Sequence, residues 1–193
     1  MNKEEVQGVD FGFIKEVEGY KTTGYVPKKD GKVLGKSGVT IASGFDLGQR
    51  GVQDLAGLPE DLAVKLLPYL SLKGKDADTI ASNLEISKEE ADIINEFAKQ
   101  EAMSKLSRQW MDTTGTNFEN LPSNKQTAVA SVAFQYGDLA KKTPNFWKQV
   151  TSGDWGAAKR NLLDFQDKYP TRRKKEAALL DEKWVRENCK KIL

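Results

Sequence analysis

The sequence predicts a mixed α+β protein in which helices dominate, and three observations lead to this class. Apolar residues recur at three- and four-residue steps over much of the chain, as in amphipathic helices. Residues 20–45 instead alternate short β-branched runs with Gly, Pro and Asp-Gly, which indicates a small antiparallel sheet. The length of 193 residues, 38% of them hydrophobic, suits one domain or two closely joined lobes with a real core.

The N-terminal part is expected to hold one helix, the sheet and two short helical segments. Residues 4–18 carry apolar side chains at helical spacing, and Gly19 follows as a residue that ends the helix. Within the sheet, the pentapeptide KKDGK at residues 28–32 is typical of a hairpin turn. Pro59 suits the first turn of a short helix, and residues 76–84 form another segment.

A long helix is expected to join the two lobes. Ser87 and Glu90 have the spacing of a capping box, which marks its start, and apolar residues recur behind it as far as Trp110. The helix therefore spans about residues 87–111. The chain is expected to be one domain, with the helix and sheet lobe over 1–86 and a helical lobe over 112–193.

The net charge of +2 conceals an asymmetry along the chain. From Ser123 to the C-terminus there are 15 Lys and Arg against 8 Asp and Glu, whereas the preceding residues carry 15 basic and 20 acidic groups. A basic half favours an anionic partner such as a cell-wall polymer, nucleic acid or a membrane, or is simply a solvated helical surface. No nucleic-acid-binding motif accompanies the charge, so we expect no nucleic-acid partner.

The residue types present exclude several kinds of chemistry. The chain has no histidine and a single cysteine, Cys189, which rules out an intrachain disulfide, a His/Cys zinc site and a Ser–His or Cys–His nucleophile. Acid–base chemistry must therefore use carboxylates, Lys or Tyr, and neither metal nor cofactor is expected. The N-terminus lacks the apolar core of a signal peptide, and the apolar runs are too short to span a bilayer.

Glu18 is the first candidate for acid–base chemistry. On a helical wheel it projects from the apolar arc beside Phe11 and Ile14, whereas Glu16 lies on the opposite margin. The negative end of the helix dipole and the apolar surroundings both favour the protonated form, so we expect a raised pKa, as a general acid requires. The alternative is an ordinary glutamate at a fraying helix end.

Asp46 is the second candidate, in the glycine-flanked segment GVTIASGFDLGQR at residues 38–50. It follows the predicted strand VTIAS, where the glycines let a polymer approach the backbone, and Thr40 in that strand supplies a hydroxyl that could hold a water together with Asp46. The alternatives are that Asp46 caps a helix, paired with Gln49, and that Thr40 only fills a strand position.

Glu18 and Asp46 together fit the requirement of glycoside hydrolysis, in which one carboxylic acid protonates the leaving oxygen and one carboxylate acts on water or sugar. A helix would supply the acid and a sheet the base, with the cleft between them. At this point the sequence resembles the phage-type lysozymes, in their pesticin-like branch. The family motifs of this lobe are Glu18-Gly19, the Thr-Ile-x-x-Gly segment at 40–44 and GFDLGQ at 44–49.

One departure from the familiar phage enzymes bears on the choice of aspartate. Those enzymes have a His after the glycine and a catalytic Asp within the preceding hairpin, whereas here Phe45 follows Gly44 and the hairpin offers only Asp30. The resemblance to the pesticin-like branch therefore favours Asp46, with Asp30 in reserve. It also implies that Gly44 and Phe45 bind substrate.

The resemblance extends into the second lobe and covers roughly residues 8–185. It rests there on Phe-Gln-Tyr-Gly at 134–137, Trp155 followed by Asn161-Leu162, and Pro-Thr-Arg-Arg at 170–173. It implies that Phe134 and Asn161 line the sugar-binding side of the cleft. It further implies that Arg172 or Arg173 lies near Glu18; the spacing does not choose between them.

The resemblance implies a lysozyme-like fold and a muramidase that acts on bacterial peptidoglycan, inverts the anomeric carbon and causes lysis. Glu18 would be the general acid, and Asp46 with Thr40 would position water. The rivals are a lytic transglycosylase and a non-catalytic wall-binding or phage-tail module. We expect a monomer, made in the cytoplasm and acting in the periplasm after release as an endolysin or delivery as a toxin. An immunity or inhibitor protein is left open as a further partner.

Overall fold

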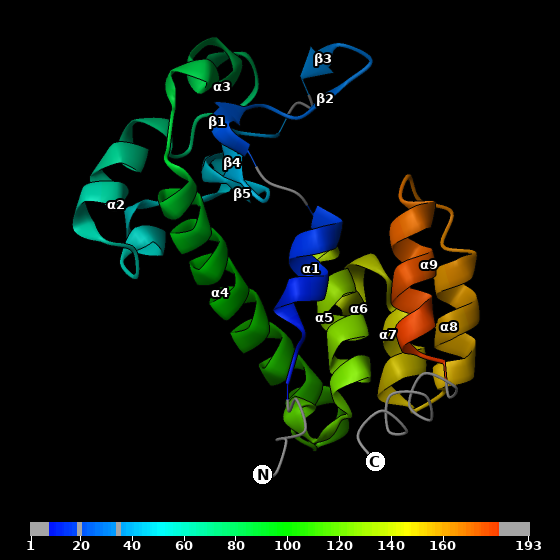
Figure 1. Ribbon diagram of the computed structural model, residues 1–193. Coiled ribbons are helices and arrows are strands. Elements are labelled where there is room, and N and C mark those ends of the chain that lie inside the picture. The colour runs from blue at the N-terminus through cyan, green and yellow to red at the C-terminus, as the bar shows by residue number, and fades with distance from the viewer. Residues whose placement is uncertain (1–7, 19–20, 34–35, 182–193) are drawn as a thin grey trace. The chain divides into compact units, whose positions relative to one another are not determined.

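The computed structural model describes residues 8–18, 21–33 and 36–181, and of Glu18 and Lys29 it describes only the backbone. The described residues form two compact units, one made of residues 8–17 with 101–181 and the other of those within 18–100. Helices make up most of the described chain, and a small antiparallel sheet accompanies them, which confirms the predicted α+β class (Figure 1).

The unit of residues 18–100 contains the sheet. Its three-stranded part has the order β1-β4-β5, and the chain pairs antiparallel throughout. A separate two-stranded hairpin is formed by β2 and β3. The strands are β1 (Lys21–Tyr25), β2 (Lys28–Lys29), β3 (Lys32–Val33), β4 (Thr40–Ala42) and β5 (Phe45–Asp46). The α-helices that lie wholly in this unit are α2 (Glu60–Leu66) and α3 (Gly74–Ile80).

The β2–β3 hairpin confirms the turn predicted from the pentapeptide KKDGK. Lys29 and Lys32 are paired at the end of the ladder, and both residues between them have positive φ, 52° at Asp30 and 76° at Gly31. Two left-handed residues in succession are what a two-residue type I′ turn requires, and Asp-Gly is among the sequences that adopt it most readily. Asp30 lies exposed at this turn.

The core of this unit joins the sheet to the helices that follow it. Buried apolar side chains from both are in contact, which fixes the sheet against α2 and α4. Burying such a side chain stabilises the fold by about 1.5–3 kcal/mol, so the sheet depends on this contact. The main contributors are Ile41, Phe45 and Leu47 from the sheet region, Leu62, Leu66 and Ile94 from the helices, and Leu84 from the segment before α4.

The long helix α4 (Lys88–Thr114) begins as the sequence predicts. The Ser87 N–H donates to Glu90 Oε2 at 2.7 Å, and the Glu90 N–H donates to Ser87 Oγ at 3.1 Å, which is the reciprocal pattern of a capping box. Lys65 Nζ also donates to Glu90 Oε1 at 2.5 Å. These bonds, first that from Lys65 and then that from Ser87, lower the pKa of Glu90.

The other unit is helical. Its helices pack as the neighbouring pairs α5 with α9, α7 with α8 and α8 with α9 (Figure 1). It contains α1 (Phe11–Glu18) as far as Val17, the second half of α4, α5 (Ser123–Tyr136), α6 (Leu139–Lys142), α7 (Pro144–Thr151), α8 (Trp155–Leu163) and α9 (Pro170–Leu179).

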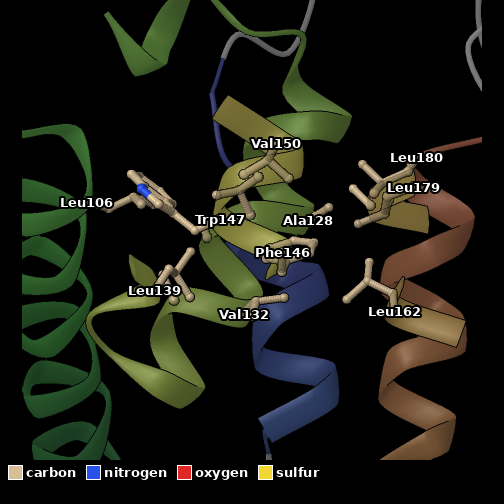
Figure 2. Close-up of a cluster of buried hydrophobic side chains, with 14 of the residues drawn as sticks. Leu106, Ala128, Val132, Leu139, Phe146, Trp147, Val150, Leu162, Leu179 and Leu180 are labelled. Carbon is tan, nitrogen blue, oxygen red and sulfur yellow. The ribbon is translucent and has the colours of Figure 1, made fainter. Parts of the chain in front are cut away.

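The core of the helical unit is built from aromatic and aliphatic side chains of several helices (Figure 2). Trp110 of α4 meets Trp147 of α7 edge to face, with ring centroids 5.8 Å apart, and meets Phe118 in the same way at 5.3 Å. Figure 2 labels further members of the same cluster, among them Leu106, Val132, Phe146 and Leu162.

Helix α1 begins later than predicted. The sequence predicts a helix over residues 4–18, whereas residues 8–10 are not helical and the helix starts at Phe11. Asp10 is the reason, because its Oδ1 accepts the Phe13 N–H at 3.0 Å while its own N–H donates to Thr127 Oγ1 at 2.8 Å. Such a residue caps a helix rather than continuing one. Residues 4–7 and the predicted stop at Gly19 lie outside the described residues.

Within the described part of the chain, no helix combines the length and the apolar character needed to cross a bilayer.

Candidate active site

Thr40 and Asp46 lie directly opposite each other on two paired strands. The sequence predicts Asp46 behind a single strand, but the chain reverses after Ala42 and places Asp46 on a strand of its own, β5. The reversal uses left-handed backbone at Ala42 (φ 52°) and Gly44 (φ 96°). Cross-strand partners share a face of the sheet, with Cβ atoms about 4.5–5.5 Å apart. The structure therefore brings these two candidates together.

Two backbone amides orient the carboxylate of Asp46. Its Oδ1 accepts the N–H of Gly48 at 2.9 Å and the N–H of Gly38 at 3.2 Å. In the described part of the chain both hydrogen bonds to this carboxylate reach Oδ1, and no bond to Oδ2 is present. The side chain is partly exposed, so Oδ2 is the oxygen that can meet a ligand.

The helix-cap interpretation of Asp46 is correct in part. Asp46 caps the 3-10 turn Leu47–Gln49 through Gly48. The predicted pairing with Gln49 is absent, because Gln49 Nε2 donates instead to the Lys36 carbonyl at 2.6 Å. Capping fixes the side chain of Asp46 without covering its second oxygen, so it does not exclude a role with substrate.

Thr40 is almost fully buried, with 3% of its surface exposed. Its Oγ1 donates to the Gly38 carbonyl at 3.1 Å. The single hydroxyl hydrogen is therefore occupied, and the oxygen remains an acceptor. The hydroxyl has a polar role within the site in addition to filling a strand position.

The two neighbouring substrate candidates, Gly44 and Phe45, differ in their exposure at the tip of the β4–β5 hairpin. Gly44 is exposed, whereas Phe45 is 4% exposed and packs edge to face on Phe97, with ring centroids 6.1 Å apart. The Arg50 guanidinium lies 3.9 Å from the centroid of the Phe45 ring. Phe45 thus contributes its side chain to the core, and Gly44 presents the exposed backbone.

Glu18 is the last residue of α1, but its side chain lies outside the described residues. The helix that carries it is well anchored in the helical unit: Ile14 is fully buried, and Phe11 packs on Phe134 of α5 with ring centroids 6.2 Å apart. Glu16 is exposed and pairs with Lys175 of α9 at 2.6 Å.

Phe134 and Asn161 both belong to the helical unit. Phe134 is half-buried on α5, and Asn161 of α8 donates from Nδ2 to Gln149 Oε1 at 2.8 Å. Neither the exposure nor the hydrogen bond tests the sugar-binding role, which stays a prediction.

The two candidate arginines, Arg172 and Arg173, belong to a buried polar network. Arg173 is 1% exposed, donates to Asp167 Oδ2 at 2.8 Å, and also bonds Glu176 Oε2 and Gln135 Oε1. Arg172 donates from Nε to Glu176 Oε1 at 3.0 Å and from Nη2 to the carbonyl of Ser131 at 2.7 Å. Glu176, fully buried, therefore joins both arginines.

The network perturbs two further side chains that the sequence did not single out. Burial raises the pKa of Tyr136, and the hydrogen bond that its hydroxyl donates to Asp167 at 2.8 Å adds to this. Burial opposes ionisation of Asp167, but the Tyr169 N–H, Arg173 and Tyr136 donate to it and lower its pKa overall. The spacing of Arg172 and Arg173 four and three residues before Glu176 was the signal available in the sequence.

No group of three or more His, Cys, Asp or Glu side chains that could hold a metal ion occurs among the described residues.

Comparison with known proteins adds the family. A family model described as "Pesticin: Bacterial toxin homologue of phage lysozyme, C-term" matches residues 8–156, which is most of the chain. The chain belongs to the pesticin family. The family is one of lysozyme homologues, and membership supports a muramidase-type cell-wall hydrolase at the level of the family. No curated protein matches the chain.

The match to the pesticin family covers one group of candidates and not the other. Glu18, Thr40, Asp46 and Phe134 lie within residues 8–156, whereas Asn161 and the two arginines lie beyond it. The family match is thus shorter than the similarity expected over residues 8–185, and it includes the whole of the β4–β5 hairpin.

Proposed function

We propose that the chain is a muramidase that cleaves the β-1,4 bond between N-acetylmuramic acid and N-acetylglucosamine in peptidoglycan. The observation that carries this proposal is the pairing of Thr40 with Asp46, whose carboxylate is oriented by two backbone amides. A carboxylate held in one orientation suits a group that aligns and deprotonates water. Membership in a family of lysozyme homologues supports the same substrate.

In the proposed reaction Glu18 is the general acid and Asp46 the general base. Glu18 gives its proton to the glycosidic oxygen as the bond from that oxygen to the anomeric carbon breaks. Water attacks the carbon from the opposite face, and Asp46 takes the proton that the water loses. The product is inverted at the anomeric carbon, for which the two carboxyl groups need to stand roughly 6.5–9.5 Å apart.

The hydrogen bonds of Thr40 and Asp46 are consistent with a water held between them. Thr40 has committed its hydrogen to the Gly38 carbonyl, so its oxygen accepts, and Asp46 offers Oδ2 as a second acceptor. A water that donates one hydrogen to each oxygen keeps a lone pair for the anomeric carbon. The two acceptors would therefore orient the nucleophile as well as bind it.

We assign the supporting role toward the acid to Arg172 rather than Arg173. The Lys175–Glu16 ion pair shows that this face of α9 lies next to α1, and Arg172 lies one turn from Lys175 on the same face. Arg173 is instead buried beside the rings of Phe165 and Tyr136, and its donors are directed at Asp167, Glu176 and Gln135.

The biological setting is part of the proposal. A lysozyme homologue reaches peptidoglycan in the periplasm either by release, as an endolysin, or by delivery, as a toxin, and the family description contains both a toxin and a phage enzyme. We propose that the chain acts there as a monomer, with Gly44, Phe134 and Asn161 among the groups that contact sugar.

Digestion of purified peptidoglycan tests this function. Release of reducing N-acetylmuramic acid ends is the expected result. Ends in the 1,6-anhydro form would indicate a lytic transglycosylase, which can work with a single glutamate. Binding to sacculi without release of soluble fragments would instead indicate a non-catalytic wall-binding module, and either result would refute the proposal.

Replacing Asp46 with Asn should lower the initial rate of reducing-end release about 10²–10⁴-fold, because general-base catalysis contributes that much. The substitution keeps the size of the side chain and an oxygen that can accept the two amides. The matched control is Asp30→Asn, in the exposed β2–β3 turn, for which we expect the wild-type rate. Loss of activity in Asp30→Asn with retention in Asp46→Asn would transfer the role to Asp30.

A further inference from the structure

Gly38 is bonded to both side chains of the proposed water site. Its N–H donates to Asp46 Oδ1 at 3.2 Å, and its carbonyl accepts the Thr40 hydroxyl at 3.1 Å. The backbone of one residue thus holds the carboxylate in place and also determines which way the hydroxyl hydrogen points. Neither bond uses a side chain of Gly38, so sequence motifs that compare side chains give no sign of this role.

Close packing explains why this position is a glycine. A Cβ built on Gly38 would lie against the backbone of Gly48 and 2.6 Å from the Leu72 carbonyl oxygen, closer than a real Cβ contact. Gly48, which provides the second amide to Asp46, is restricted in the same way, since its Cβ would be 2.6 Å from the same carbonyl. The two amides reach one carboxylate oxygen because two residues without side chains lie against each other.

A third segment holds this glycine pair together. The Ser71 N–H donates to the Leu47 carbonyl at 3.1 Å, and the Gly74 N–H donates to the Ser37 carbonyl at 3.0 Å. Residues 71–74 are therefore hydrogen-bonded to the chain beside Gly38 and to the chain beside Gly48. The distance between the two amides is fixed by backbone bonds on both sides.

We propose that Gly38 is a positioning residue for catalysis, which sets the orientation of the Asp46 carboxylate and of the Thr40 hydroxyl together. The inference rests on the proposed function, since it gives these orientations a role in aligning water. Gly38 touches neither water nor sugar, and it acts through the two side chains. A displaced backbone at residue 38 shifts both acceptors at once, while the sugar-binding surfaces on other residues keep their shape.

The variant Gly38→Ala tests this proposal by its kinetics. Misplacement of a catalytic group by about 1 Å can cost roughly 100-fold in rate, so we expect kcat for reducing-end release to fall by 10- to 100-fold with KM unchanged. The matched control is Gly51→Ala, because Gly51 has an ordinary φ of −106° and the nearest atom to its added Cβ is 3.8 Å away. Equal kcat in the two variants, with Gly38→Ala folded, would overturn the proposal.

A second measurement needs neither enzyme activity nor the Ala variant. In NMR spectra, the Gly38 and Gly48 amide protons of the wild-type protein should carry the downfield shift of a hydrogen bond to a carboxylate, and Asp46→Ala should move both resonances upfield. The Gly51 amide, which donates to Asp54 Oδ2 at 2.7 Å, should keep its chemical shift in that variant. A change at only one of the Gly38 and Gly48 amides, or at neither, would overturn the proposal even if Gly38→Ala fails to fold.

The two measurements separate failure of the inference from failure of the proposed function. If wild-type protein releases no ends from peptidoglycan, the muramidase proposal fails, and the role of Gly38 in catalysis fails with it. If wild-type protein is active and Asp46→Ala does not move both amide resonances, the muramidase proposal stands and the positioning role of Gly38 is wrong.

Discussion

Replacing Glu18 with Gln is expected to abolish almost all lysis of purified peptidoglycan, with a rate loss of about 10²–10⁴-fold. Gln has the shape of Glu but carries no proton that it can give to the glycosidic oxygen. Cleavage would then depend on protonation by solvent. The measurement is the initial rate of reducing-end release, with folding of the variant checked by circular dichroism.

The control for Glu18→Gln lies two residues earlier on the same helix. Glu16 is exposed and forms an ion pair with Lys175, so Glu16→Gln removes a surface charge and leaves the core of α1 unchanged. We expect the rate of Glu16→Gln to stay within about twofold of wild type, because exposed ion pairs contribute little. Near-normal lysis by Glu18→Gln, beside a similar rate for Glu16→Gln, would show that Glu18 is not the acid.

Replacing Glu176 with Ala is expected to produce the largest loss of stability. Its fully buried carboxylate accepts from Ser131 Oγ at 2.5 Å and from both Arg172 and Arg173. Removing it deletes the buried carboxylate that the two guanidinium groups share, and breaking such a buried ion pair costs about 3–5 kcal/mol. In a chain of this length, each kcal/mol of lost stability lowers the Tm by about 2–4 °C. The Tm of Glu176→Ala should therefore fall by roughly 6–20 °C.

The comparison for this prediction is Glu16→Ala, which breaks an exposed ion pair between a glutamate and a lysine. Its Tm should change little, because solvent screens the charges and the side chains lose conformational freedom when they pair. The Tm of Glu176→Gln should lie between those of wild type and Glu176→Ala, because the glutamine keeps a hydrogen-bond acceptor but loses the charge. A Glu176→Ala Tm within about 2 °C of wild type would mean that the network does not stabilise the helical unit.

Features that depend on neighbouring residues could be predicted from the sequence. The β2–β3 turn follows from the freedom of Asp30 and Gly31 to adopt positive φ, and the start of α4 follows from the reciprocal bonds of Ser87 and Glu90. In both cases the interacting groups are at most three residues apart, so the local sequence contains the whole cause.

The geometry at Asp46 depends on contacts that the local sequence does not contain. The reversal between β4 and β5 places Ala42 at a φ of 52°, a conformation that an alanine rarely adopts and no turn motif indicates. The turn is held partly from outside, since Asn95 of α4 accepts the Ser43 N–H at 2.9 Å. The second amide on Asp46 comes from Gly38, whose position depends on packing against Gly48 and Leu72.

The role of Phe45 shows the same division between local pattern and tertiary structure. Its place in the GFDLGQ motif suggests contact with substrate, whereas its ring is packed between Phe97 and the Arg50 guanidinium. A strand alternates its side chains between two faces, so a residue next to a site residue on the same strand points away from it. Phe45 precedes Asp46 directly, and it is the one that enters the core.

The anomeric configuration of the first product tests most directly whether Glu18 and Asp46 act on a water held between them. Short oligomers of alternating N-acetylglucosamine and N-acetylmuramic acid would be digested and the new reducing ends followed by ¹H NMR before mutarotation. The account predicts that the α anomer appears first, because the water attacks from the face opposite the leaving group. Initial formation of the β anomer would mean that configuration is retained through a double displacement, and would contradict a direct attack by water aligned on Asp46 and Thr40.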